Sequence, residues 1–270
     1  EDQSNLDVIR KITEGEANEI QQEIHDGLVN LGLGSLLIPE QYGGLGLDLL
    51  FATAVSQSLG EGLGPIPFAG SYIMAPLAIM HGGNQEQKNN YLTKMSENSM
   101  RIGVGFSEYI GARDNANISI NDNKISGRAL FVIDAKDASH LMLSDKNGMI
   151  GIVELSSSGI EITELVAVDK TRNFLEVQLK DVDIDILELT STSKEAIDKS
   201  IDAGRIILAA DSLGASQALI DKAVEYSKER KQFNRVIGSF QAVKHMCAEM
   251  AADLEPVSYT HLRAHETILD

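Results

Sequence analysis

The chain has 270 residues, is 43% hydrophobic and 23% charged, and carries a formal net charge of −17 at pH 7. This length allows two or three domains with a sizeable core, and no stretch approaches the roughly 20 apolar residues that a membrane span requires. The strong negative charge argues against nucleic-acid binding, because a phosphate backbone attracts a broad basic surface.

The first hundred residues predict short helices separated by glycine-rich loops. A polar helix is expected near 6–30, and the glycines and proline of LGLGSLLIPEQYGGLGLD (31–48) favour tight turns over helix. FATAVSQSLG (51–60) predicts a helix that stops at Gly60. Two more helical segments follow, SYIMAPLAIMHG and NQEQKNNYLTKM, the second with Asn84 as its N-cap.

From about residue 104 the hydrophobic period changes from helical to two. Ile118 and Ile120 alternate with polar residues before an Asn/Asp turn, and Asn147-Gly148 lies between two apolar runs, a strong hairpin signal. FLEVQLKD (174–181) alternates apolar and polar residues as a half-buried strand does. The middle third therefore predicts a small antiparallel sheet or barrel.

Helix returns around residue 194 as two amphipathic segments. Ser239 stands where an N-cap would start the second, and Pro256 is expected to interrupt it. The last fifteen residues lose the apolar pattern, so we expect a foreign tail there and a natural chain that continues past Glu255. The apolar stripes are Ile201, Leu208, Ala215, Leu219, Ala223 and Tyr226, then Phe240, Val243, Cys247, Met250 and Leu254.

The helical, β, helical order predicts an α+β protein in consecutive parts. The expected boundaries are an N-terminal helical domain over 1–103, a central β domain over 104–190, an incomplete C-terminal helical domain over 191–255, and the aberrant tail over 256–270. We find no internal repeat.

Common catalytic and ligand motifs are absent from the sequence. No Gly-x-Gly-x-x-Gly follows a strand, and neither a phosphate loop nor a nucleophile elbow is present. No metal site is predicted: His261 and His265 have helical spacing but lie in the tail, and His245 with Cys247 has no second pair. A single cysteine and the lack of a secretory leader favour a reducing, cytoplasmic location.

The stretch KERKQFNRVIGSFQAVKH (228–245) is a basic island in an acidic chain. This stretch contains five cationic residues and a single anionic one, Glu229, so its local charge is +4. The cationic residues are Lys228, Arg230, Lys231, Arg235 and Lys244. One interpretation is an exposed basic turn between helices. The other is a dinucleotide site, because guanidinium and amide groups bind pyrophosphate and Phe233 offers a face for adenine.

RKQFNRVIGSFQAVKHMCAEM (230–250) resembles the signature of the acyl-CoA dehydrogenase family. LGLGSLLIPEQYGGLG, GGNQEQKNNYLTKM and IDAGRIILAADSLGASQALIDKAVEYSKERKQF resemble other parts of that family in the same order, so the resemblance covers about residues 20–255. It implies an N-terminal helical domain, a central antiparallel β-barrel and a C-terminal helical bundle, with FAD between barrel and helices.

The resemblance also implies cofactor contacts. Arg230, Gln232, Phe233 and Gln241 would meet the pyrophosphate and adenine of FAD, reaching across a subunit interface of a homo- or hetero-oligomer. In the central domain, the cofactor contacts would come from Ser107, Phe131 and Ile133. Ile133 replaces a threonine of the family and has no hydroxyl for flavin N5.

The implied reaction is α,β-dehydrogenation of an acyl-CoA thioester, as in fatty acid β-oxidation. A carboxylate removes the α-proton while the β-hydride passes to flavin N5, and electron-transferring flavoprotein is the expected acceptor. Some members carry this carboxylate where the chain has Gly204. Most carry a glutamate in a C-terminal segment that we expect to lie beyond this sequence, so no catalytic residue is assigned. Asp202 and Arg205 match substrate-binding positions near the CoA-binding wall, although a helix cap and a structural ion pair explain them equally well. Arg113 stands at a substrate position where the family has a serine.

GSFQAVKH and VDKTRNF are most similar to the bacterial branch that acts on steroid side-chain or other bulky acyl-CoA thioesters. In that branch two unlike subunits can share one FAD site. An alternative is therefore a non-catalytic subunit that completes the FAD site of a partner.

Overall fold

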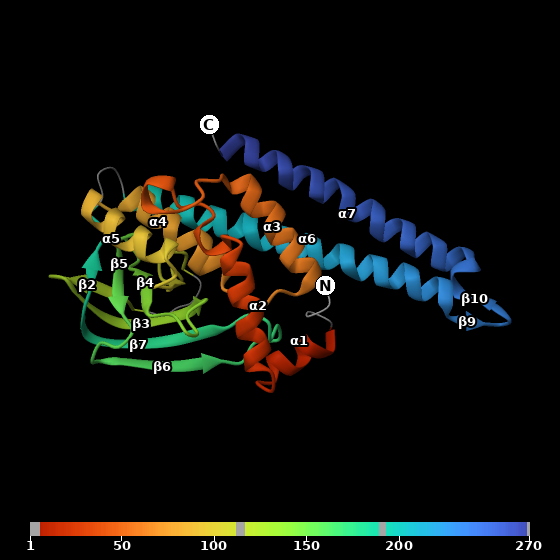
Figure 1. Ribbon diagram of the computed structural model, residues 1–270, viewed down its shortest axis with the longest axis horizontal. Helices are drawn as coiled ribbons and strands as arrows, with labels where there is room; N and C mark the ends of the chain where they lie inside the picture. The colour runs from red at the N-terminus through yellow and green to blue at the C-terminus, as the bar shows by residue number, and fades with distance from the viewer. Residues whose placement is uncertain (1–5, 112–116, 189–192, 269–270) are drawn as a thin grey trace. The chain divides into compact units, whose positions relative to one another are not determined.

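The computed structural model describes residues 6–111, 117–188 and 193–268 (Figure 1). The chain divides into two compact units. A sheet unit comprises residues 2–48 and 65–205, and a helical unit comprises residues 49–64 and 206–270. Helix α6 (Ser193–Glu229) contributes its first part to the sheet unit and the remainder to the helical unit.

The sheet unit begins with short helices. The single helix expected near 6–30 is two helices, α1 (Leu6–Thr13) and α2 (Asn18–Asn30), because the backbone turns at Gly15 with a φ of +77° that favours glycine. The glycine-rich segment that follows forms two 3₁₀ turns, η1 (Leu33–Ser35) and η2 (Glu40–Tyr42), as its composition predicts.

Three helical elements follow in the sheet unit: the π-helix η3 (Phe68–Met74), α4 (Ala75–Gly82) and α5 (Gln85–Ser96). The predicted N-cap of α5 is confirmed. Asn84 Oδ1 accepts from the Gln87 main-chain N–H at 2.8 Å, while Gln87 Oε1 accepts from the Asn84 N–H at 3.1 Å. This reciprocal pair is a capping box and satisfies two N–H groups at the helix start.

The strands form one mixed sheet rather than a barrel. The order is β6-β7-β3-β1-β4-β5-β8, and β2 pairs with β3 outside this path. Among the described residues no ladder joins the edge strands β6 and β8, and β8 has two residues, too few to close a barrel. The strands are β1 (Ile102–Gly105), β2 (Ser119–Asn121), β3 (Lys124–Ile133), β4 (His140–Ser144), β5 (Ile150–Glu154), β6 (Ile160–Leu165), β7 (Phe174–Asp183) and β8 (Asp185–Ile186).

The prediction of a wholly antiparallel sheet was also wrong. β1 pairs antiparallel with β3 but parallel with β4, because the loop after β3 carries the chain past β1 to its other side. The two predicted hairpins are confirmed. β2 and β3 turn at Asp122-Asn123, and β4 and β5 turn around Asn147-Gly148.

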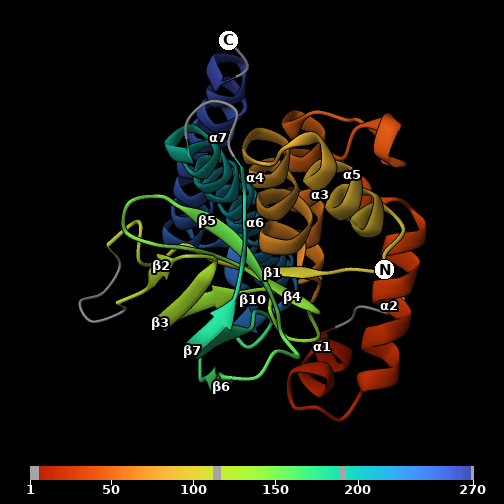
Figure 2. The same cartoon turned by 90° about the vertical axis from the view of Figure 1, so that its left-hand side faces the viewer.

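Two hydrophobic clusters hold the sheet unit together. One lies between the strands themselves and contains Ile125, Leu141 and Val177, none of which is exposed to solvent. The other packs helices α4, α5 and the start of α6 onto the sheet through residues such as Ile79, Leu92 and Ile197. Figure 2 shows α4 and α5 beside β1, β4 and β5. The second cluster fixes the ends of β1 and β3 against helices.

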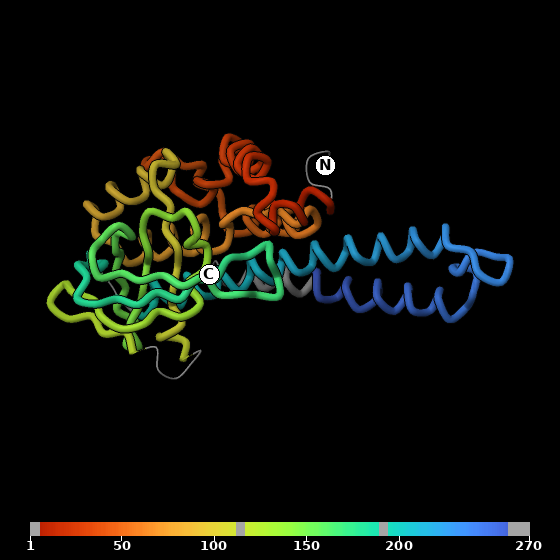
Figure 3. The backbone as a smooth tube through the Cα atoms, turned by 90° about the horizontal axis from the view of Figure 1, so that it is seen from below, coloured from red at the N-terminus to blue at the C-terminus, as the bar shows by residue number. Residues whose placement is uncertain are grey.

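The helical unit contains α3 (Leu49–Gly62), the later part of α6, and α7 (Gln241–Ile268). The later part of α6 and α7 run antiparallel, side by side, in Figures 1 and 3. Ser56 Oγ donates to the Ile207 carbonyl oxygen at 2.7 Å, and Gly60 and Gly214 allow backbones to meet. A Cβ on Gly214 would lie 1.9 Å from the Gln57 oxygen, so only glycine fits there.

Three sequence expectations for the last helices were wrong. Helix α7 continues through Pro256 to Ile268, because one missing hydrogen bond does not end a helix that is otherwise bonded. Ser239 lies in the 3₁₀ turn η4 (Ile237–Ser239) and donates to the Val236 oxygen instead of capping α7. Leu219, of the predicted apolar stripe, is 68% exposed, because α3 packs on the face of α6 that carries Ile207 and Gly214.

Within the described ranges of the chain, no helix combines the length and apolar character needed to cross a bilayer. In the same ranges, His, Cys, Asp and Glu side chains form no group of three or more suited to a metal ion.

Candidate functional site

The predicted cofactor residues of the sheet unit lie where β1 and β3 end. Val104 of β1 pairs with Ile133 of β3, and a Cβ on Gly105 would lie 3.0 Å from a methyl group of Val132. Ser107 follows two residues after β1. The sheet register therefore brings Ser107 close to the last residues of β3.

Phe131 occupies a β-bulge in β3. The register against β7 shifts between Ala129 and Val132, and Phe131 has a φ of +54°, which costs on the order of 1 kcal/mol for a side chain of this kind. Its neighbours Leu130 and Val132 are buried, whereas Phe131 is 41% exposed. The bulge presents an aromatic ring to solvent at the end of the strand, and Ile133 lies half-buried beyond it.

Ser107 is buried, and its hydroxyl makes no hydrogen bond within the described part of the chain. The turn that carries it is held by Tyr109, whose Oη donates to Asp198 Oδ1 of α6 at 2.7 Å. This hydrogen bond to the carboxylate raises the pKa of Tyr109. The turn after β1 is thereby fixed to α6.

Asp134 fixes the end of β3. Its Oδ2 accepts from the main-chain N–H groups of Gly70 at 2.5 Å and Ser71 at 3.4 Å, and Ser71 Oγ donates to the Ile102 oxygen at 2.9 Å. Burial raises the pKa of Asp134, while the Gly70 N–H and the charge of Arg172 oppose the shift. The π-helix thus joins the start of β1 to the end of β3.

On α6, the predicted substrate residues Asp202 and Arg205 form an ion pair at the sheet-unit end of the helix. Arg205 Nη1 lies 2.9 Å from Asp202 Oδ1, and both side chains are more than half exposed. Between them, a Cβ on Gly204 would lie 2.5 Å from Met74 Sδ. This contact leaves no space for a glutamate side chain at position 204 unless Met74 moves.

In the helical unit, residues 230–237 form a hairpin between α6 and α7. β9 (Lys231–Gln232) pairs antiparallel with β10 (Arg235–Val236). Phe233 and Asn234 form a two-residue turn with φ values of +53° and +61°, as a type I′ turn requires at both positions. The Ile237 N–H donates to the Arg230 oxygen at 2.8 Å and closes the loop.

The hairpin presents an aromatic ring among cations. Phe233 is 86% exposed and meets Phe240 edge to face at 6.2 Å between ring centroids, while the Arg235 guanidinium lies 3.8 Å from the Phe240 centroid. Gln232 and Gln241 are exposed. No cation of the basic island pairs with a carboxylate among the described residues.

The sequence-predicted residues therefore form three groups. Ser107, Phe131 and Ile133 lie near the ends of the paired strands β1 and β3, and Asp202 and Arg205 pair on α6. The predicted cofactor residues of the basic island lie on the hairpin and at the start of α7: Arg230, Gln232, Phe233 and Gln241. Arg113 lies outside the described residues.

Sequence reasoning missed the groups that hold these segments. Tyr109 and Asp198 stand 89 residues apart and carry no local signal, and Asp134 acts through the backbone of a helix 64 residues earlier. A polar pocket bounded by Asp134 was missed as well. Its lining residues come from five separate parts of the chain, so no local pattern marks them.

Comparison with known proteins defines the class of this fold. Residues 5–99 match the family model of the acyl-CoA dehydrogenase N-terminal domain, and residues 195–270 match that of the C-terminal domain. The chain belongs to the acyl-CoA dehydrogenase family, whose members are FAD-dependent oxidoreductases.

Individual relatives share about a quarter of their residues with the chain. YngJ of Bacillus subtilis, whose name assigns it to the acyl-CoA dehydrogenases, is 26% identical over 92% of this chain and 71% of its own length. The 3-(aryl)acrylate reductase of Clostridium sporogenes is 26% identical over 87% and 68%. The structure of glutaryl-coenzyme A dehydrogenase with glutaryl-CoA has a TM-score of 0.79 at 24% identity, covering 92% of this chain and 71% of that one.

Proposed function

We propose that this chain carries the α,β-dehydrogenation of an acyl-CoA thioester with FAD as its cofactor. The observation that carries the proposal is the hairpin of residues 230–237, which presents an exposed phenyl ring and several cations at the family's signature positions. A phenyl ring that is 86% exposed is unfavourable for a simple surface turn, since most of its apolar surface stays in water. It suits a ligand with a planar base and a dianionic pyrophosphate.

The hairpin fits the nucleotide end of FAD. Arg230 would donate charge-assisted hydrogen bonds to the pyrophosphate, and Gln232 and Gln241 would donate from their amides. Phe233 offers an open ring surface for adenine, because its side chain is 86% exposed. Because the whole chain carries a net charge of −17, we interpret this positive island as a site for one particular anionic ligand rather than as part of a generally anion-binding surface.

The corner formed by β1 and β3 fits the flavin ring in part. Phe131 offers an exposed aromatic surface on a bulge, and the hydroxyl of Ser107 could hydrogen-bond a ring heteroatom. Ile133 can contribute apolar contact only, since it has no hydroxyl. The hydrogen bonds of Asp134 and Tyr109 would keep both segments in place.

Bound FAD supplies a two-electron acceptor for the hydride equivalent lost from the β-carbon. The chain's own residues would bind and orient the thioester, with Asp202 and Arg205 on the substrate wall as predicted. Gly204 cannot act as the base that takes the α-proton, and Met74 fills the space beside it. No residue of this chain is assigned as the base, and the steroid or other bulky acyl group stays a prediction.

A second candidate function is a non-catalytic subunit that lends the hairpin to a partner's FAD. The absence of a hydroxyl at Ile133 and of space for a carboxylate at Gly204 favours it. Electron-transferring flavoprotein as acceptor, and homo- versus hetero-oligomeric assembly, stay predictions under either candidate.

The two candidates are separated by the flavin content of the purified full-length protein. If the chain is an enzyme, we expect a yellow protein whose flavin absorbance near 450 nm bleaches when an acyl-CoA is added without oxygen. If it is a partner subunit, we expect a colourless protein that raises the FAD affinity of a second subunit. A colourless protein with no effect on any partner would contradict both.

A further inference from the structure

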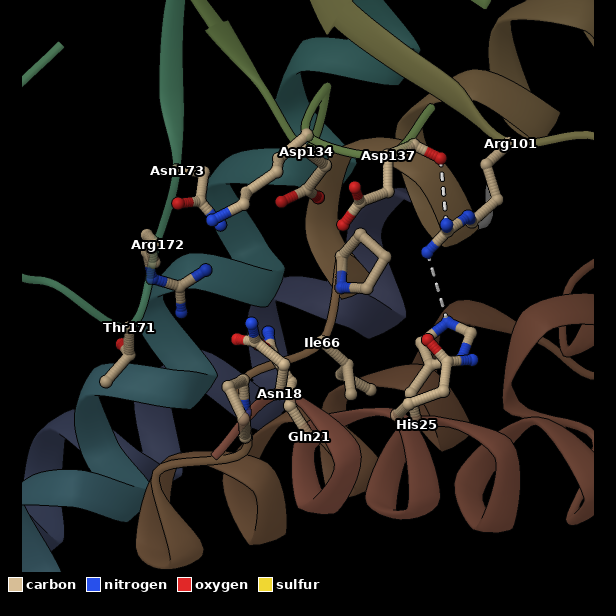
Figure 4. A pocket seen from close by; sticks show the side chains of 14 residues that line it. Asn18, Gln21, His25, Ile66, Arg101, Asp134, Asp137, Thr171, Arg172 and Asn173 are labelled. Atoms are coloured by element: carbon tan, nitrogen blue, oxygen red, sulfur yellow. Dashed lines mark hydrogen bonds between the residues drawn. The ribbon is translucent and has the colours of Figure 1, made fainter. Parts of the chain in front are cut away.

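A polar pocket lies within the sheet unit, outside the residues assigned to flavin or acyl-CoA (Figure 4). Its volume is about 470 Å³, within the range of small-molecule sites. In Figure 4 the pocket lies between helix α2 and the loops that follow β3 and β6. The ionisable side chains that line it are His25, Arg101, Asp134, Lys136, Asp137 and Arg172.

Three of these side chains, Asp134, Lys136 and Arg172, have partners that compensate their charge. Asp134 accepts from the N–H groups of Gly70 and Ser71. Lys136 Nζ lies 3.7 Å from Glu164, and Arg172 Nε lies 3.6 Å from Asp169. These groups have protein partners in the absence of any ligand.

Arg101 and Asp137 differ from the other charged residues. Arg101 Nη2 donates to the main-chain oxygen of Asp137 at 2.8 Å, and Nη1 lies 3.4 Å from His25 Nε2. Both contacts are with groups that carry no formal negative charge. Among the described residues, neither the Arg101 guanidinium nor the Asp137 carboxylate has an ion-pair partner within 4 Å.

The two side chains also do not pair with each other. In Figure 4 the Asp137 carboxylate and the Arg101 guanidinium border the same hollow, with the guanidinium beside His25. A half-buried guanidinium gains from a carboxylate partner, since burial weakens its hydration. Within the described part of the chain, the two residues therefore leave a positive and a negative group uncompensated around one cavity.

A ligand with both charges matches this arrangement better than a simple ion. An anion would meet Asp137 as well as Arg101, and a cation would meet Arg101 as well as Asp137. A zwitterion satisfies both, and the amides of Asn18, Gln21 and Asn173 can bind its remaining polar atoms. Ile66 and its flanking prolines provide an apolar wall for a small side chain.

We propose that this pocket binds a small zwitterion of the α-amino acid class, with its carboxylate on Arg101 and its ammonium group on Asp137. Tyr72 supports the proposal because it holds His25, the residue beside Arg101, in position. Tyr72 Oη lies 2.8 Å from His25 Nε2, so a phenol that keeps its proton holds the imidazole that borders Arg101.

Calorimetric titration of the purified protein with three matched compounds tests the proposal. L-alanine carries both charges, propionate lacks the ammonium group, and ethylamine lacks the carboxylate. We expect saturable alanine binding with a Kd on the order of 1 mM, and at least tenfold weaker binding of the other two. If propionate binds as tightly as alanine, the pocket is an anion site and the zwitterion proposal is wrong. If alanine does not bind, the proposal of a ligand site in this pocket is wrong.

Variants locate the binding. Arg101→Gln and Asp137→Asn should each weaken alanine at least tenfold, and Asp137→Asn should not weaken propionate. Asn tolerates the positive φ of +60° at position 137, so this variant should fold, as circular dichroism would verify. Lys180→Gln and Glu161→Gln remove one charge of each sign outside the pocket and should leave the affinity unchanged. Equal losses in all four variants would overturn the assignment.

Discussion

Tyr109 and Asp198 are joined by a 2.7 Å hydrogen bond that ties the turn after β1 to helix α6. The turn carries Ser107, a proposed flavin contact, and a Cβ on Gly148 would lie 3.2 Å from the Tyr109 ring. The tyrosine therefore braces the turn through its hydroxyl at one end and through its ring against the turn between β4 and β5.

Removing the Tyr109 hydroxyl should destabilise the sheet unit modestly. Tyr109→Phe keeps the ring but deletes the hydrogen bond to Asp198, so we expect a loss of about 1 kcal/mol in the free energy of unfolding. Urea denaturation monitored by circular dichroism measures it. Tyr226→Phe is the matched control, because Tyr226 is more than half exposed. Equal effects of the two substitutions would show that the Asp198 contact contributes nothing.

Asp134 should give the sheet unit a measurable pH dependence. Burial raises its pKa above the ordinary value of 3.8, so the folded state binds more protons than the unfolded state just above that pH. The contribution of Asp134 to stability is therefore fully present below pH 3.8 and is lost as pH rises through the folded-state pKa. Asp134→Asn cannot ionise and should gain stability relative to wild type between about pH 4 and pH 7.

Urea midpoints at those two pH values measure the Asp134 effect. Asp183→Asn serves as the control, since Asp183 is exposed and pairs with Lys124 at the surface. A constant difference between wild type and Asp134→Asn across the range would contradict the burial effect.

The effect of replacing a helical glycine with alanine should depend on the space beside its Cα atom. Gly27 of α2 has no atom within 4 Å of the point where an alanine methyl group would lie, so Gly27→Ala should stabilise by about 0.5–1 kcal/mol through helix propensity. Gly214→Ala meets the Gln57 backbone oxygen and should destabilise by more than about 2 kcal/mol. Gly204→Ala should fall between them, since the flexible Met74 can move. Thermal unfolding of the three variants measures their stabilities. A stability order other than Gly27→Ala, then Gly204→Ala, then Gly214→Ala would contradict the contacts described here.

The turn residue Phe233 should show opposite effects on stability and on cofactor binding. Its positive φ is strained for phenylalanine but suits asparagine, so Phe233→Asn should raise the free energy of unfolding by about 0.5 kcal/mol. The same change removes the exposed ring and should weaken FAD binding at least tenfold. Asn234→Gly alters the turn without touching the ring and should leave FAD affinity unchanged. Unchanged FAD affinity in Phe233→Asn would exclude adenine stacking.

The sequence predicted local elements better than their arrangement. The hairpin at Asn147-Gly148 and the capping box at Asn84 depend on neighbouring residues, so their signals survive in the sequence. The open edge of the sheet and the parallel pairing of β1 with β4 depend on where loops carry the chain, and periodicity cannot show that. Resemblance to the family predicted a barrel that the strand ladders do not close.

The candidate site shows the same division. The basic hairpin was predictable because its cations, aromatic ring and amides lie within eighteen consecutive residues. The pairs Tyr109 with Asp198 and Arg101 with His25 are long-range, and each residue alone is unremarkable in the sequence. Exposure of Leu219 also could not be predicted, since α6 has apolar residues on more than one face and α3 selects which is buried.

FAD affinity of the full-length protein, measured for wild type and for Arg230→Gln, tests the central claim most directly. We predict that wild type, alone or with its partner subunit, binds FAD and that the variant binds about 10- to 150-fold more weakly, the loss of a charged hydrogen-bond donor worth about 1.5–3 kcal/mol. Lys222→Gln, an exposed charge outside the basic island, should match wild type. Identical FAD affinities for wild type and Arg230→Gln would contradict the assignment of the hairpin to the cofactor.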